Sequence, residues 1–208
     1  MRGLDWRPYR TMLAGLDAFE RHHALAPLAT LQLQLRPRSA DASLAGVTLA
    51  IDSASVHIDV PIDVHGSFTL PRHQQAEDEA ADLLLNRKRG DFGWLPAIHS
   101  PSVPADSRRL GDLRLECEIR WAVERGDAPP TVRDAFAAAG GACHSRLIAV
   151  SFAAPYRLAQ ISLKHAAQEQ ALPVTLLSPD RKSYTVPLYD THWPDDTLVL
   201  LQADSKPN

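Results

Sequence analysis

The chain has little of what usually identifies a protein class. It contains two cysteines and 6% aromatic residues, and asparagine occurs only at positions 86 and 208. With so few asparagines, no N-x-Ser/Thr glycosylation site is present. No apolar run approaches the roughly 18–20 residues that are needed to cross a bilayer. The sequence therefore predicts no transmembrane segment.

Short catalytic motifs are absent as well. We find no G-x-S-x-G elbow, no phosphate-binding P-loop, no G-x-G-x-x-G and no H-E-x-x-H. Each of these motifs places a nucleophile, a phosphate or a metal ion by a known geometry. We therefore expect no cofactor and no identifiable catalytic residues, and favour a non-enzymatic protein. A hydrolase of a class without a short motif stays open as an alternative.

The charge balance bears on the partner. The net charge is −3, charged residues make up 23% of the chain, and both signs are mixed along it. A nucleic-acid-binding protein usually carries a basic patch and a positive net charge. We therefore expect no nucleic acid as partner, which leaves a small ligand or another protein. The hydrophobic content of 45% is ordinary for a globular chain that buries a real core.

The first 23 residues do not have the pattern of a secretory signal. Their apolar residues are interrupted by aspartate, arginine and glutamate, so no continuous hydrophobic segment of a signal peptide exists. We expect a periplasmic or secreted location if a signal was removed before this numbering begins, and a cytoplasmic one otherwise.

The two cysteines, Cys117 and Cys143, are predicted to form a disulfide. The bond would close a loop of about 27 residues, for which the chain-entropy estimate is roughly 3–4 kcal/mol. Two buried free thiols are the alternative, because cysteine is among the most buried residue types. Neither cysteine has the spacing of a zinc site. A disulfide favours an exported protein, because such bonds persist in oxidising compartments.

The most regular pattern in the chain runs from Leu113 to Trp121. Apolar and charged residues alternate there without a break. A period of two is typical of a strand with one face in a core and the other in water. The sequence therefore predicts a strand over residues 112–123, with Cys117 on its buried side.

The other expected elements define the fold class. Helical spacing of apolar residues predicts a helix over residues 9–25 and short helices over 74–89 and 131–139. Alternation predicts strands over residues 31–36, 47–51, 56–60, 68–70, 146–152, 157–164, 172–178, 183–189 and 197–202. We expect a mainly β protein of antiparallel β-sandwich units, with an N-terminal helix and two short helices.

The domain organisation is expected to have three parts. Residues 1–27 form an N-terminal helix packed on the body, and residues 28–150 form a β-sandwich with a long loop at 90–109. Residues 151–208 form a β-rich C-terminal part, which is either a second sandwich unit or a completion of the same sheet. The loop carries three prolines and two glycines, and loops of its length are often functional.

The same loop holds the candidate binding residues, which are large side chains among small and turn-forming ones, with arginines at both ends. They are Phe92, Trp94, His99, Arg89 and Arg108. Such a loop is suited to an anionic or aromatic ligand, or to a partner protein. The alternative is that Trp94 and Ile98 pack into the core as a lid over a sheet.

No metal site is expected. His57 and Asp59 share one side of the predicted strand 56–60, and two such side chains could contribute to a metal site. The apolar residues of that strand alternate with them and face the core. His57 and Asp59 therefore face water as ordinary polar partners.

Residues 44–71 resemble the carboxypeptidase regulatory-like (transthyretin-like) β-sandwich family. The similarity is carried by G-V-T-L at 46–49, V-P-I-D at 60–63 and G-S-F-T-L-P at 66–71, with His65 in place of the family's aspartate before Gly66. The resemblance implies a β-sandwich of the kind found on exported proteins, and no catalytic residues. We therefore expect a non-enzymatic exported or periplasmic protein that binds a ligand or a protein partner. A structural module of a surface assembly is a further alternative.

Overall fold

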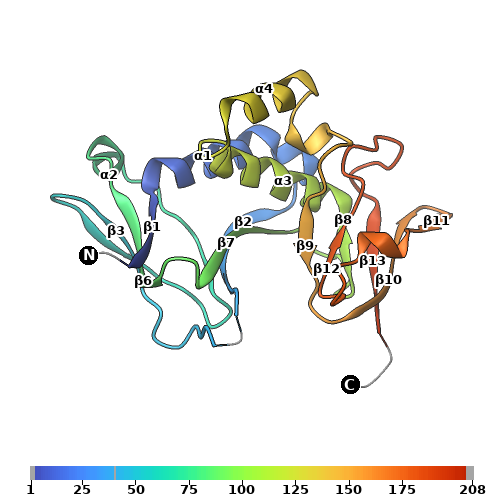
Figure 1. Ribbon diagram of the computed structural model, residues 1–208, viewed down its shortest axis with the longest axis horizontal. Coiled ribbons are helices and arrows are strands. Elements are labelled where there is room, and N and C mark those ends of the chain that lie inside the picture. The colour runs from blue at the N-terminus through green and yellow to red at the C-terminus, as the bar shows by residue number, and fades with distance from the viewer. Residues whose placement is uncertain (1–2, 40, 205–208) are drawn as a thin grey trace.

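Two lobes flank a central layer of helices and strands (Figure 1). The computed structural model describes residues 3–39 and 41–204. The N-terminal lobe, at the left of the figure, holds the first sheet and α2 (Gln74–Asp78), and the C-terminal lobe, at the right, holds the sheets formed after residue 106. Helices α1 (Tyr9–His22), α3 (Leu110–Glu124) and α4 (Pro130–Ala138) lie across the top, and β2 (Thr30–Pro37) and β7 (Phe92–His99) run beneath them.

The sheet of the N-terminal lobe has four antiparallel strands. Their order is β1 (Leu4–Pro8), β6 (Asp82–Lys88), β3 (Leu49–Asp52) and β4 (His57–Val60). Alternate side chains of a strand point to the same face, so Leu83 and Leu85 of β6 join Leu49 and Ile51 of β3 in the N-terminal core. We use this name for the buried apolar cluster between Tyr9 and Phe92, to which α1 contributes its buried face.

A three-stranded antiparallel sheet lies between the lobes. Its order is β5 (Ser67–Phe68), β2 and β7. Leu33 and Leu35 of β2 are buried in the N-terminal core, whereas Gln32, Gln34 and Arg36 alternate with them on the opposite face. This second, polar face borders the candidate site.

The C-terminal lobe contains two antiparallel sheets. One has the order β11 (Gln168–Ala171), β10 (Leu158–His165), β13 (Leu198–Ala203) and β8 (Ser107–Arg109). The other pairs β12 (Ser183–Thr185) with β9 (Ser151–Ala153). Three short 3₁₀ turns complete the chain: η1 (His23–Leu25), η2 (Ala142–His144) and η3 (Val174–Leu176). The C-terminal core is the buried apolar cluster between Leu110 and Leu201.

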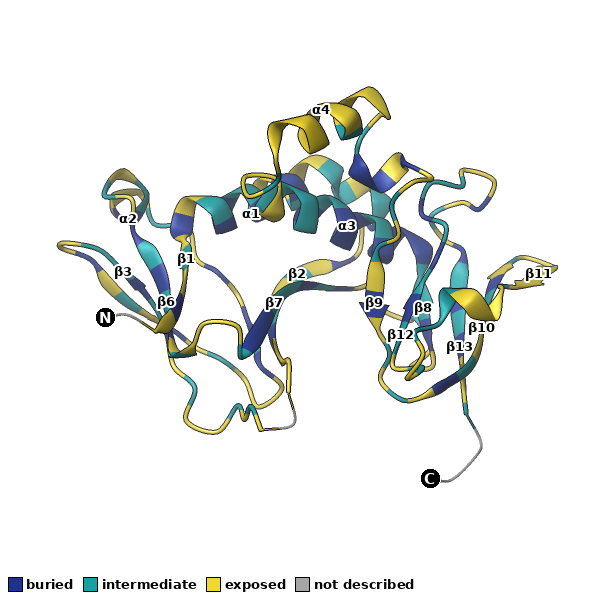
Figure 2. Ribbon diagram, in the orientation of Figure 1, coloured by how far each residue is buried: buried dark blue, intermediate teal, exposed yellow. Residues whose placement is uncertain are grey.

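Residues 112–123 are helical, so the strand predicted there was wrong. Leu110, Leu113 and Cys117 of α3 lie in the C-terminal core, while Leu115 and Ile119 lie in a smaller central core. Figure 2 accordingly shows buried residues along α3, between the lobes. Because the helix packs on two sides, its two apolar stripes interleave in the sequence and imitate a period of two.

The helix packing also explains how the charged residues of α3 are accommodated. Arg114 donates from Nη1 to the carboxylate of Asp195 over 2.6 Å, and Glu118 lies 3.2 Å from His144. Gly111 allows α3 to lie close to the backbone of Leu25, because a Cβ placed at position 111 would lie 2.1 Å from the carbonyl oxygen of Leu25. The segment whose sequence pattern predicts a half-buried strand is thus a helix that is buried on several sides.

Three further expectations were wrong. Residues 74–89 are helical only through Asp78, since Ala80 has a φ of +51° and β6 follows. Residues 90–109, expected as a long loop, contain β7 and β8. Residues 172–178, expected as a strand, contain η3 instead. The strands β6, β7 and β8 pair with segments far away in the sequence, so tertiary context decides the outcome there.

The disulfide between Cys117 and Cys143 is confirmed, with an S–S distance of 2.02 Å and a Cα–Cα distance of 5.8 Å. It joins α3 to η2, just beyond α4. The predicted helix over residues 131–139 is also confirmed, but α4 has no buried residue. Phe136 packs edge-on against Trp121 at 5.0 Å between ring centroids. The disulfide and this ring contact therefore hold α4 on α3.

The expected fold class is confirmed in its main features. Strands make up 33% of the chain and helices 26%, in several antiparallel sheets packed with an N-terminal helix. The central helix α3 is the addition that the sequence did not predict. None of the helices in the described part of the chain has the length and apolar character needed to span a membrane.

Candidate functional site

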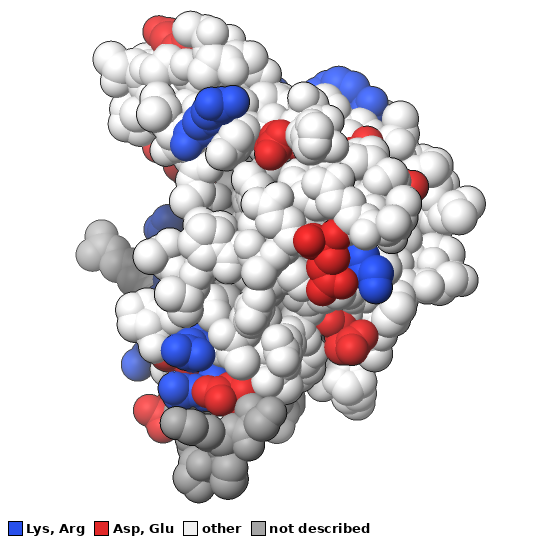
Figure 3. Space-filling model, turned by 90° about the vertical axis from the view of Figure 1, so that its right-hand side faces the viewer, with Lys and Arg blue, Asp and Glu red and all other residues white. Residues whose placement is uncertain are grey.

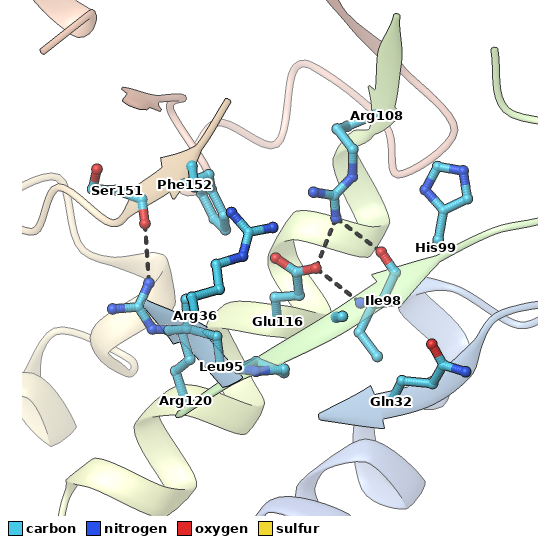
Figure 4. Close-up of a pocket in the computed structure, with 13 residues that line it drawn as sticks. Gln32, Arg36, Leu95, Ile98, His99, Arg108, Glu116, Arg120, Ser151 and Phe152 are labelled. Carbon is cyan, nitrogen blue, oxygen red and sulfur yellow. Dashed lines mark hydrogen bonds and ion pairs between the residues drawn. The ribbon is translucent and has the colours of Figure 1, made fainter. Parts of the chain in front are cut away.

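A pocket of about 190 Å³ lies where the central sheet meets the C-terminal lobe (Figure 4). Its walls come from β2, β7, α3, β8 and β9. Three arginines from three different elements line it: Arg36 of β2, Arg108 of β8 and Arg120 of α3. We call it the arginine pocket. Glu116 is the single carboxylate among its lining residues.

Arg108 and Glu116 form the most buried ion pair at the pocket. Their side chains are 19% and 8% exposed, and Nη2 of Arg108 lies 2.7 Å from Oε1 of Glu116. The same Nη2 donates to the carbonyl of Ile98 over 2.8 Å, and Oε1 of Glu116 accepts from the amide of Ile98 over 2.8 Å. These contacts occupy both backbone groups of Ile98, so this ion pair belongs to the frame of the pocket.

Electrostatics keep Arg108 charged in spite of its burial. Burial acts to lower the pKa of the guanidinium, but the negative charge of Glu116 and the nearby Tyr184 outweigh that effect and raise the pKa. The negative charge of Glu116 therefore mainly compensates the positive charge of Arg108.

Arg120 lies at the opposite wall. It donates from Nη1 to the carbonyl oxygen of Ser151 over 3.1 Å, and its Nε is 3.8 Å from a carboxylate oxygen of Glu124. This Nε is buried and makes no hydrogen bond with any described residue. The guanidinium is therefore positioned by β9 and retains donor capacity.

Arg36 has no carboxylate partner within the described residues. Its Nε donates to the side-chain oxygen of Gln34 over 2.8 Å. It pairs across the strands with Gly93, which has no side chain to compete for the space. In Figure 4 the guanidinium of Arg36 points into the pocket, on the side of Phe152. Arg36 is therefore the most available of the three cations.

Tyr184 stands behind the pocket wall. It is 1% exposed, and its ring lies 5.9 Å from that of Phe152. Burial raises the pKa of Tyr184 to about 12, partly opposed by the charge of Arg108. Neither its hydroxyl nor Nε of Arg108 forms a hydrogen bond in the part of the chain that the structure describes. Both groups are buried, and a buried polar group without a hydrogen bond is unfavourable.

The positive charge of the arginine pocket is local. Figure 3 shows the face of the C-terminal lobe, where acidic and basic side chains are scattered over a largely uncharged surface. The arginine pocket, in contrast, has three guanidinium groups and one carboxylate in its lining. The arrangement favours an anion.

The five residues predicted from the sequence do not gather at one place. His99 and Arg108 line the arginine pocket. Phe92 is 1% exposed in the N-terminal core, and Arg89 is exposed on the turn after β6. Phe92 lies six positions before Ile98, at the other end of β7. The ligand-binding role of Phe92 and Arg89 stays a prediction, and neither residue lines the arginine pocket.

Trp94 takes part in the packing of the N-terminal lobe. Its indole N–H donates to Asp5 over 3.0 Å, and its ring meets Phe68 edge-on at 6.1 Å. Ile98 is buried as well. Both side chains are thus placed as the lid alternative requires. The ligand-binding role of Trp94 remains a prediction.

Arg36, Arg120 and Glu116 were missed as site residues. The strand interpretation placed Glu116 and Arg120 on a solvent face. On a helix, residues four positions apart lie on the same side. A helical interpretation would therefore have placed Glu116 and Arg120 together, facing one neighbour. For Arg36 the only signal was its place on the polar face of a strand.

A metal centre is not indicated. Within residues 3–39 and 41–204, no three histidine, cysteine, aspartate or glutamate residues cluster as metal ligands would. His57 instead lies 2.8 Å from Asp52 and 3.6 Å from Asp59 on an exposed surface.

Comparison with protein-family models, with curated proteins and with solved structures gives no match. The resemblance of residues 44–71 to the transthyretin-like family therefore stays a prediction. In the structure this segment contributes β3 and β4 to the sheet of the N-terminal lobe and β5 to the central sheet.

Proposed function

We propose that the protein is a non-enzymatic, extracytoplasmic binding protein that recognises a carboxylate or another small oxyanion in the arginine pocket. One observation carries the proposal: Arg36, Arg108 and Arg120, from three separate elements, line one pocket whose lining contains a single carboxylate, that of Glu116. The disulfide supports an oxidising location outside the cytoplasm.

The chemistry of arginine supports an oxyanion. Its planar guanidinium presents paired N–H donors that match the two oxygens of a carboxylate or phosphate. Arg36 and Arg120 have donors beyond those used in the described contacts, while Arg108 is held by Glu116. We therefore assign direct anion contact to Arg36 and Arg120, and the positioning of the pocket wall to Arg108.

The size of the pocket limits the group that enters it. A volume of about 190 Å³ holds about six water-sized groups, below the roughly 300–1,000 Å³ of sites for drug-sized ligands. Apolar side chains such as Leu95 and Phe152 form part of the wall. A carboxylate on a short carbon chain suits both the charge and the volume.

Titration calorimetry with glutarate, acetate and phosphate tests the proposal. We expect saturable binding of at least one of these anions, which weakens as salt is added. Arg36→Gln and Arg120→Gln should each weaken binding roughly 10–100-fold, since a hydrogen bond to a charged group contributes about 1.5–3 kcal/mol.

The matched control is Arg133→Gln, which removes an exposed arginine from α4 and should leave binding unchanged. Equal affinity in the wild type, Arg36→Gln and Arg120→Gln would show that the pocket does not bind the anion. No binding of any anion by the wild type would overturn the proposed function.

A further inference from the structure

The strand β9 presents a free edge beside the arginine pocket. In the described part of the chain it pairs only with β12. Phe152 lies opposite Tyr184, and the amide of Ala154 donates to the carbonyl of Lys182 over 2.8 Å. Backbone groups alternate in direction along a strand, so those of Ser151 and Ala153 point away from β12. Both residues line the pocket and are exposed.

An arginine already occupies part of this edge. Nη1 of Arg120 donates to the carbonyl of Ser151 over 3.1 Å. An anion bound by Arg120 would therefore lie next to the outward backbone groups of β9. The cationic pocket and the free strand edge form one continuous surface.

The edge of β7, across the pocket, is closed to strand pairing. The amide and the carbonyl of Ile98 are taken by Glu116 and Arg108. Pro96, two residues earlier on the same edge, has no N–H to donate. A chain that enters the pocket can therefore extend a sheet only at β9.

The volume of the pocket leads to the same conclusion. It has room for one carboxylate on a short chain, and exposed residues from both sides, including Arg36 and Ser151, form its rim. A larger ligand would place one acidic group inside and the remainder along the rim. An extended peptide does this naturally, because its alternate side chains point to opposite faces.

We propose that the natural ligand of the arginine pocket is an extended acidic peptide segment that adds as a strand to the free edge of β9. One aspartate or glutamate side chain of the segment would lie between Arg36 and Arg120. Main-chain hydrogen bonds to Ser151 and Ala153 would supply affinity, and the pocket would supply specificity, as in other cases of strand addition. The inference rests on the proposed function of the pocket.

The test compares the affinity of the wild-type protein for peptides with its affinity for a small carboxylic acid. The probe is the capped pentapeptide Val-Thr-Glu-Thr-Val, measured by calorimetry beside glutarate, which carries the same terminal carboxylate. We expect the peptide to bind at least 10-fold more tightly than glutarate. The same peptide with glutamine in place of glutamate should lose at least 10-fold in affinity.

Two backbone-methylated versions of the peptide test the strand geometry. One is methylated at the first and third amides and the other at the second and fourth. Alternate amides face β9, so one version should bind at least 10-fold more weakly than the other. Equal binding of both versions would overturn strand addition.

The variant Ala153→Pro tests the same edge from the side of the protein. It removes the outward N–H of residue 153 and spares the amides of Phe152 and Ala154 that face β12. We expect the peptide to lose more affinity than glutarate does, because only the peptide would make a main-chain hydrogen bond to residue 153. If this variant does not fold, the methylated peptides on the wild type still decide the question.

The remaining outcomes separate the two proposals. If glutarate binds as tightly as the peptide, the inference fails and the proposed function stands. If the peptide does not bind, the inference fails, and if glutarate, acetate and phosphate do not bind either, the proposed function fails with it. If the glutamine peptide binds as well as the glutamate peptide, the pocket does not read the acidic side chain and the inference is overturned.

Discussion

The cores of the two lobes differ in the kinds of residue that are buried in and beside them. The N-terminal core is a single apolar cluster between Tyr9 and Phe92, and Asp5 is the buried polar residue beside it. The rest of the described chain, from Ser100 on, contains a disulfide and the other buried polar residues. These are Ser100, Ser107, Asp112, Glu116, Ser145 and Thr197. Apolar burial thus dominates the first lobe, and specific polar contacts are added in the second.

The difference places the candidate site at the boundary between the two kinds of core. Buried charges are favourable only when they are paired and hydrogen-bonded. Asp112 is stabilised by hydrogen bonds, since it accepts from the amide and the hydroxyl of Ser100 over 2.8 and 2.6 Å. At the arginine pocket the cations outnumber the carboxylates, so the condition is not met by the chain alone. An excess of positive charge is unfavourable in a core, but a binding site for anions requires it.

The largest expected effect concerns the buried ion pair. Glu116→Ala leaves the guanidinium of Arg108 without its ion partner and the amide of Ile98 without an acceptor. We expect a loss of about 3–5 kcal/mol in the free energy of unfolding, measured by urea denaturation. Glu124→Ala, at the exposed end of the same helix, should cost less than about 0.5 kcal/mol. Similar losses in the free energy of unfolding for the two variants would show that paired buried charge and surface charge contribute equally to stability here.

Removal of the disulfide should act on the second lobe alone. Reduction, or Cys117→Ser with Cys143→Ser, is expected to cost about 3–4 kcal/mol because it frees a loop of about 27 residues. Hydrogen exchange should show faster exchange in α4, β9 and β10, with β3 and β6 of the N-terminal lobe little changed. Equal loss of protection in both lobes would show that the two cores unfold as one unit.

The smallest effect belongs to the N-terminal lobe and depends on pH. Hydrogen bonds from Ser55, Ser53 and Gln75 lower the pKa of Glu79 from 4.5 to about 2. A lowered folded-state pKa stabilises the protein above the unfolded-state value, and this stabilisation is lost as the pH falls from about 4.5 to 2. The difference in urea midpoint between the wild type and Glu79→Gln should therefore be largest near pH 6 and vanish near pH 2.

Asp82→Asn provides the control of opposite sign. Burial, followed by the charge of Asp52, raises the pKa of Asp82. A raised folded-state pKa of a carboxyl group stabilises the protein at low pH and less so as the pH rises. The wild type should therefore lose stability relative to Asp82→Asn as the pH increases. The same slope for both variants would contradict the hydrogen-bonding assignment of Glu79.

Much of the fold was predictable where the pattern and the packing agree. The spacing of residues 9–25 predicted α1, and alternation predicted β2, β3, β10 and β13, because each buries a single face. The prediction failed for α3, where two buried stripes interleave, and for β6, where a favourable charge pattern resembled a helix. Local sequence cannot report how many sides of an element will be covered.

The candidate site was less predictable than the fold. Sequence alone drew attention to Arg108 and His99, which do line the arginine pocket, and equally to Phe92, at the other end of β7, and Arg89, on the turn before it. Arg36 and Arg120 are 84 positions apart, and no short motif connects them. Their proximity depends on the docking of α3 against β7.

Residue periodicity was enough to predict the antiparallel sheets and the N-terminal helix, and the presence of only two cysteines was enough to predict the disulfide. The tertiary structure alone decided that α3 is a helix, that β9 keeps a free edge and that three arginines line one pocket. These features depend on contacts between distant segments, whose free energies outweigh local preferences.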